Sequence, residues 1–250
     1  MIRLPAAADP GLTPALHPHP DRPTRLSGWL SGLVLASLAC ATSAQAASIQ
    51  VTVLDRDGKP LPDAVVVVTP PAGAALRGAK PPLPLQASIN QEKMQFVPAV
   101  TIVGLGAKVR FLNSDPWDHH VRLTLPGLPP AASASATDGV ALRLEGKSDG
   151  KPAKFADVVM DKPGALGANI MGCFIHGSMS GHIYVAESPW TVKTGPDGVA
   201  QIDNLPEGNA TVQVWHGLLT VAPKPQAATL GAVPGKSTVH LDVLPRRRRT

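Results

Sequence analysis

Aromatic side chains and cysteine are both scarce in this sequence. Phenylalanine, tryptophan and tyrosine together make up 4% of its 250 residues, and only two cysteines occur. No long stretch repeats its apolar residues with the 3.6-residue period of an amphipathic helix, which argues against a helical protein. Proline and glycine, with 27 and 23 residues, are frequent by contrast. Short strands joined by tight turns fit this composition, so the sequence predicts an all-β protein.

The sequence also lacks an apolar run long enough to cross a membrane. The run at residues 29–41 falls short of the roughly 20 apolar residues that a spanning helix needs. It follows a basic, proline-rich start and precedes Ala44-Gln45-Ala46, an order typical of a secretory signal peptide. We therefore expect residues 1–46 to be a signal peptide cleaved after Ala46, with export to the periplasm and no stable membrane span.

Cleavage would leave a single cysteine. Cys40 lies inside the expected signal peptide, so the mature chain keeps only Cys173, which has no partner for an internal disulfide. A free thiol is open to oxidation in an oxidising compartment, and a bound metal would protect it. A buried, inert cysteine is the alternative, since cysteine is among the most buried residue types. The residues around Cys173 favour the metal.

The expected mature chain has little net charge. Acidic and basic residues balance from Ala47 to Pro245, and the positive excess comes from the arginines at residues 246–249. A role in nucleic-acid binding therefore has no support. We expect residues 245–250 to form a disordered basic tail, available to an acidic partner or to the membrane surface.

Residues 172–185, GCFIHGSMSGHIYV, contain three metal-binding side chains within seven positions: Cys173, His176 and Met179. Residues 111–121, FLNSDPWDHHV, add His119 and His120. One thiolate, two imidazoles and a weak thioether are the ligands of an electron-transfer copper site. Adjacent residues of a strand face opposite sides, so only one of the two upstream histidines should bind. The sequence therefore predicts a type 1 (blue) copper site that holds one copper ion.

Four other functions compete with electron transfer. A copper chaperone or store would favour exposed clusters of methionine and histidine, but the methionines here are few and scattered. An oxidase or nitrite reductase needs further copper bound by repeated H-x-H motifs, which are absent. A Cys–His hydrolase needs an orienting Asp or Asn, and a metal-free sandwich would make the Cys/His/Met spacing a coincidence. We therefore expect an electron carrier and not an enzyme, with copper handling as the alternative.

Two short motifs far apart in the sequence look like halves of one small domain. Residues 58–65, GKPLPDAV, resemble the opening of a carboxypeptidase regulatory-like (transthyretin-like) β-sandwich. This pattern usually continues with a turn and an L-P-x-G motif. Here the turn occurs in altered form at residues 194–198, and the L-P-x-G motif occurs at residues 205–208. We expect residues 47–70 and 188–244 to fold together, with a linker at 71–87 and a second domain inserted at 88–187. Residues 49–54 should then pair with strands from residues 199–244, and Pro70 should lie close to Pro189.

The inserted domain resembles the cupredoxins. Its C-x₂-H-x₂-M spacing is that of amicyanin, and the following M-x-G-x-I-x-V and the upstream F-x-N-x₅-H-x-V also agree. With its D-K-P-G turn, the run resembles still more closely exported bacterial proteins labelled methylamine utilization or plastocyanin-like. The resemblance implies a Greek-key β-sandwich in which His119, Cys173 and His176 are the trigonal copper ligands and Met179 is the axial one. The motif register favours His119 over His120.

The resemblance further implies a monomer that exchanges single electrons with a redox partner of unknown identity. Phe174 and Ile175 form an apolar flank of the copper loop, suited to presenting the edge of His176 to that partner. His182 is expected to point outward as a surface histidine. Met160 and Met171 are expected in the core.

Overall fold

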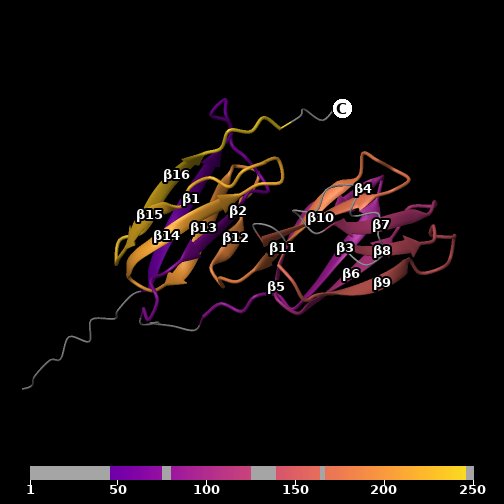
Figure 1. Cartoon of the computed structure of the whole chain (residues 1–250), viewed down its shortest axis with the longest axis horizontal. Helices are drawn as coiled ribbons and strands as arrows, with labels where there is room; N and C mark the ends of the chain where they lie inside the picture. Colours follow the sequence, from indigo (N-terminus) through magenta and orange to yellow (C-terminus); the bar gives the residue numbers. More distant parts are fainter. Residues whose placement is uncertain (1–45, 75–79, 125–138, 164–166, 246–250) are drawn as a thin grey trace, which may run out of the picture. The chain divides into compact units, whose positions relative to one another are not determined.

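The computed structural model describes residues 46–74, 80–124, 139–163 and 167–245 (Figure 1). The expected signal peptide, except Ala46, and the tail residues 246–250 lie outside this part of the chain. The strands confirm the all-β class: β1 (Ala47–Leu54), β2 (Val65–Thr69), β3 (Gln86–Glu92), β4 (Gln95–Val97), β5 (Val100–Gly104), β6 (Ala107–Asn113), β7 (His119–Thr124), β8 (Gly139–Leu144), β9 (Lys154–Met160), β10 (Ala168–Cys173), β11 (Ser180–Ala186), β12 (Thr191–Lys193), β13 (Val199–Leu205), β14 (Gly208–Trp215), β15 (Gln226–Leu230) and β16 (Gly235–His240). A search of the described residues finds no helix long and apolar enough to span a membrane.

Strands β3 to β11 form one sandwich, called here the middle sandwich. Its sheets have the strand orders β5-β11-β10-β7-β8 and β4-β3-β6-β9. Alternation along each strand turns one row of side chains inward, as in β6, where Val109 and Phe111 are buried while Lys108 and Arg110 are exposed. The inward rows make a core that includes the expected Met160 and Met171.

Strands β1, β2 and β12 to β16 form the split sandwich, with the orders β13-β1-β16 and β12-β2-β14-β15. Indigo β1 lies beside yellow β16 in Figure 1, although the two are far apart in the sequence. β1 pairs antiparallel with β13 and parallel with β16, so the expected pairing of residues 49–54 with residues 199–244 is present. The domain limits stay predictions, and so does the resemblance of the split sandwich to carboxypeptidase regulatory-like domains.

The chain leaves the split sandwich and returns to it at neighbouring points. The Ser188 hydroxyl donates a hydrogen bond to the Val68 carbonyl oxygen at 2.6 Å, and the Val68 N–H donates to the Trp190 carbonyl oxygen at 2.9 Å. Pro70 and Pro189 line the same surface hollow. An insertion into a loop requires this closeness of the two crossing points.

The turn at residues 194–198 joins the two parts of the split sandwich. The buried Thr194 hydroxyl accepts a hydrogen bond from the Ala64 N–H (2.9 Å) and donates one to the Leu61 carbonyl oxygen (2.8 Å). Gly198 has a φ of +71°, and a Cβ there would lie 2.6 Å from the Val53 carbonyl oxygen. Glycine alone fits this position, because any side chain would meet the backbone of β1.

His182 of β11 is not the surface histidine that the sequence predicted. Its ring meets Trp215 of β14 edge-on, with ring centroids 5.1 Å apart, and the side chain is half-buried. Burial, followed by the charge of His216, lowers the pKa of His182 to about 4. Alternation along β11 indicates which face of the sheet His182 lies on, but not that Trp215 covers this position.

Candidate metal centre

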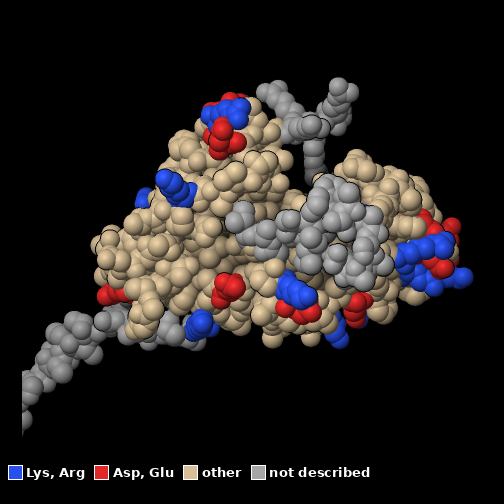
Figure 2. Space-filling view, viewed as in Figure 1, with Lys and Arg blue, Asp and Glu red and all other residues tan. Residues whose placement is uncertain are grey.

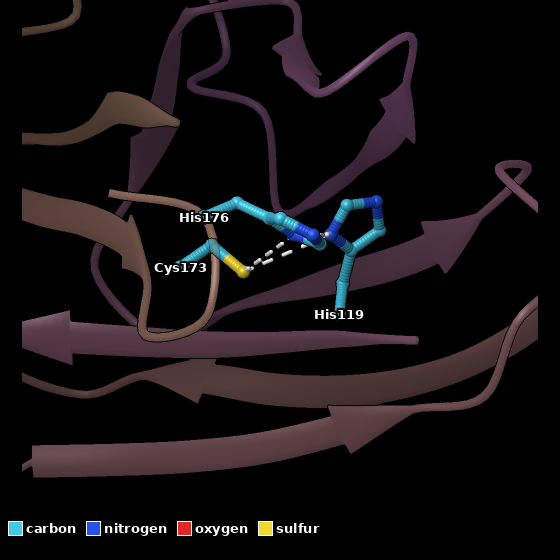
Figure 3. Close-up of side chains that lie close together, drawn as sticks. All are labelled: His119, Cys173 and His176. Atoms are coloured by element: carbon cyan, nitrogen blue, oxygen red, sulfur yellow. Dashed lines mark hydrogen bonds between the residues drawn. The ribbon is translucent and has the colours of Figure 1, made fainter. Parts of the chain in front are cut away.

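The sheet register brings the predicted ligands together from two neighbouring strands. His119 is the first residue of β7 and Cys173 is the last residue of β10, and these strands pair antiparallel with Cys173 opposite Val121. The Phe174 N–H continues the ladder by donating to the His120 carbonyl oxygen at 3.2 Å. The chain then turns through His176, where the Met179 N–H donates to the His176 carbonyl oxygen at 2.9 Å, and enters β11. In Figure 3 the side chains of His119, Cys173 and His176 point toward one another.

The three side chains place one sulfur and two nitrogens at metal-ligand spacing. Cys173 Sγ lies 3.7 Å from His119 Nδ1 and 3.6 Å from His176 Nδ1, and the two Nδ1 atoms are 3.1 Å apart. With bonds of about 2.0 Å to nitrogen and about 2.3 Å to sulfur, ligands at roughly 120° around one ion have N and S about 3.7 Å apart. The donor atoms therefore fit a single ion, and the thiolate–imidazole set supports one copper ion.

Most of the site is closed to water. His119 is 0% exposed, Cys173 6% and Met179 2%, whereas His176 is half-buried. Cys173 and Met179 belong to the apolar core of the middle sandwich. Cys173 therefore differs from an inert core cysteine, because two imidazole nitrogens lie within 3.7 Å of its buried sulfur. Among the described residues, no other group of three His, Cys, Asp or Glu side chains has metal-ligand spacing.

The other candidate residues take the places that strand alternation predicts. His120 is half-buried and lies outside the Cys–His group, on the opposite side of β7 from His119. Phe174 and Ile175 are 59% and 52% exposed, so the expected apolar flank of the loop is present. The guanidinium of Arg122 stacks over the Phe174 ring at 4.7 Å.

Asn113, the Asn of the F-x-N motif, shapes the turn that leads to His119. It is fully buried, and its amide donates to the carbonyl oxygens of Trp117 (2.8 Å), Leu144 (3.1 Å) and Glu145 (3.0 Å). Its side-chain oxygen accepts the Asp115 N–H at 3.0 Å. One side chain therefore fixes both ends of the turn, which sets where β7 begins.

Asp115 contacts a predicted ligand, and the sequence analysis gave it no role. Its carboxylate accepts a hydrogen bond from His119 Nε2 at 2.8 Å. Burial acts to raise the pKa of this carboxyl, but hydrogen bonds from His119, Met94 and Lys93 outweigh it and hold the pKa below its ordinary value. Asp115 is thus ionised near neutral pH. In the sequence, only the position of Asp115 four residues before His119 pointed to this contact, and that spacing is a weak signal by itself.

No family model matches the chain, and no curated protein matches it either. The solved structures that match include an amicyanin from Paracoccus versutus, with 14% identity over 48% of this chain and 97% of that one and a TM-score of 0.31. A pseudoazurin from Sinorhizobium matches with 24% identity over 41% and 75%, at a TM-score of 0.27. A Cu-containing nitrite reductase from Thermus scotoductus matches with 22% identity over 54% and 28%, at 0.31.

Proposed function

We propose that this protein is a periplasmic carrier of single electrons, with one type 1 copper ion bound by His119, Cys173, His176 and Met179. The observation that carries the proposal is the convergence of Cys173 Sγ and the two Nδ1 atoms within 3.7 Å of one another. Copper supplies the one-electron chemistry when bound, cycling between two oxidation states. The redox partner would be another protein, and the chain itself would pass electrons without carrying out a catalytic step.

The residues have distinct tasks in this proposal. Cys173 gives the strong thiolate bond, His119 and His176 complete the plane, and Met179 offers a weak axial sulfur. His119 and Cys173 are held at the ends of paired strands, so these donors keep their positions whichever oxidation state the ion has. Burial of three of the four side chains excludes water from the ion. Half-buried His176 is the ligand nearest to solvent, beside the exposed Phe174 and Ile175.

A copper chaperone or store is the alternative function, and the burial of the donors argues against it. Handing an ion to another protein requires that incoming ligands reach it, but His119 and Cys173 are almost fully covered. A carrier should keep copper through repeated reduction and oxidation in the presence of a chelator. A chaperone should lose the ion to the chelator on reduction.

The first test is to add Cu(II) to the purified mature protein and to record absorption and electron paramagnetic resonance. We expect one copper per chain and an intense blue or green thiolate-to-copper band. Cys173→Ser should abolish the band, because the thiolate is its source, while Ser178→Ala in the same exposed loop should retain it. A colourless copper complex, binding of zinc alone, or a Cys173→Ser variant that stays coloured would contradict the proposal.

A further inference from the structure

Three N–H groups from two distant segments donate to the carboxylate of Asp115. Its Oδ1 accepts from the backbone N–H of Lys93 at 2.7 Å, and its Oδ2 accepts from the N–H of Met94 at 3.1 Å and from His119 Nε2 at 2.8 Å. Asp115 is 4% exposed, so water offers little competition for these donors. Its own N–H is held by Asn113, which fixes the carboxylate in place.

We propose that Asp115 is a positioning residue that selects the tautomer of His119 and joins the copper site to the turn between β3 and β4. This inference rests on the proposed function, since it assigns His119 Nδ1 to the metal. A neutral imidazole carries one N–H. The carboxylate is an acceptor, so it draws that proton to Nε2. Nδ1 then keeps a free lone pair, and Nδ1 is the atom that faces Cys173 and His176.

The same carboxylate supports an unfavourable turn. Lys93 and Met94, between β3 and β4, have φ values of +52° and +62°, a left-handed conformation that costs energy for residues with side chains. A two-residue hairpin of this kind normally carries Asn-Gly. Here the N–H groups of both residues point at Asp115 and find an acceptor there. The carboxylate therefore stabilises the turn, and the turn holds Asp115 against His119 in return.

Replacing Asp115 with Asn separates these contacts, because an amide has one oxygen for three donors. If the amide oxygen stays with Lys93, the NH₂ faces His119 Nε2 and the Met94 N–H, and it favours the His119 tautomer with the proton on Nδ1, a protonated nitrogen that cannot bind a metal. If the oxygen stays with His119, it also keeps the Met94 N–H, but the NH₂ meets the Lys93 N–H, which loses its acceptor. The matched control is Asp118→Asn, in the same turn, whose carboxylate binds Arg143 and the Gly146 N–H and contacts no predicted ligand.

The experiment uses the full mature chain without metal. Nitrogen-15 NMR of the histidine rings, with His119 assigned through His119→Gln, reports which nitrogen carries the proton. We expect Nε2–H in the parent and in Asp118→Asn, and a shift toward Nδ1–H in Asp115→Asn. Copper affinity should fall by about 10- to 100-fold in Asp115→Asn, the range for loss of a partner behind a metal ligand. An unchanged tautomer together with unchanged affinity would overturn the proposal.

A second background distinguishes positioning from folding. Lys93→Asn with Met94→Gly gives the turn its preferred residues, so the turn no longer depends on Asp115. Adding Asp115→Asn there should cost less stability than in the parent, while the tautomer and affinity changes persist. Disappearance of those changes, or failure of Asp115→Asn to fold in both backgrounds, would show that Asp115 acts through the fold alone. A parent that gives no blue spectrum would refute the electron-carrier proposal but leave the tautomer measurement standing.

Discussion

At the scale of single residues, the two adjacent histidines provide the sharpest contrast. His119 is fully buried with its Nδ1 3.7 Å from Cys173 Sγ, whereas His120 lies on the other side of β7. We expect His119→Ala to lose the thiolate-to-copper band and to weaken copper binding by more than about 100-fold, the upper range for residues behind a ligand. His120→Ala should keep the band. Copper titrations followed by absorption would check this, and the reverse pattern would move the ligand by one residue.

The grouping of His119, Cys173 and His176 could be predicted because much of its geometry is local. The C-x₂-H-x₂-M spacing confines Cys173, His176 and Met179 to one turn, and alternation along a strand is enough to separate His119 from His120. Asp115 could not be predicted in the same way, since two of its three donors come from a turn more than twenty residues earlier. Its partners depend on the β3–β6 pairing, which no short motif records.

At the scale of strands and turns, Thr194 is the residue whose loss should matter most to the split sandwich. Replacing its hydroxyl in Thr194→Val leaves the Ala64 N–H and the Leu61 carbonyl oxygen buried without partners. Each such group costs about 1–3 kcal/mol, so we expect a loss of roughly 2–6 kcal/mol in unfolding free energy for the two groups. Urea unfolding would measure it.

The matched control for Thr194→Val is Thr211→Val on the exposed face of β14. It should change the unfolding free energy by no more than about 0.5 kcal/mol. Equal effects of the two substitutions would show that the Thr194 hydroxyl does not join the two parts of the sandwich. The thiolate-to-copper band should survive both substitutions, because neither residue lies near Cys173 in the strand order.

The strands themselves were largely predictable, but their partners were less so. Alternating apolar residues indicate β1 and β7. The turn motif at residues 194–198 indicates that the segment before the inserted domain pairs with the segment after it, as β1 does with β13. The parallel pairings of β1 with β16 and of β3 with β6 join segments that only the complete sheet brings together. Such non-local pairs depend on packing across the whole core, which the local pattern does not contain.

At the scale of the whole molecule, charge is low and mixed. In Figure 2 the basic and acidic side chains on the visible face lie in neighbouring groups of both signs. Arg110 pairs with Asp157 and Arg143 pairs with Asp118, each with a nitrogen–oxygen distance of 2.7 Å. The sequence prediction of no nucleic-acid partner rested on the same balance. This face would therefore present no strong electrostatic field of one sign to a redox partner.

The last prediction concerns the stability of the whole chain at acid pH. The pKa of His182 is lowered to about 4 by burial and by His216, whereas an unfolded histidine titrates near pH 6.5. Between these values the unfolded chain binds more protons at this residue, so the contribution of His182 to the unfolding free energy should be constant above about pH 6.5 and fall as the pH drops toward 4. Burial also lowers the pKa of His216, although the charge of Asp63 and a hydrogen bond with the Pro62 backbone oppose this effect. The contribution of His216 to stability therefore changes with pH in the same direction.

In metal-free protein, His182→Phe should reduce the difference between the unfolding free energies measured in urea at pH 7 and at pH 4.5. Replacement of the exposed His240 with Gln should leave that difference unchanged. Parallel pH dependences in the parent and in His182→Phe would show that the contact with Trp215 does not exclude the proton.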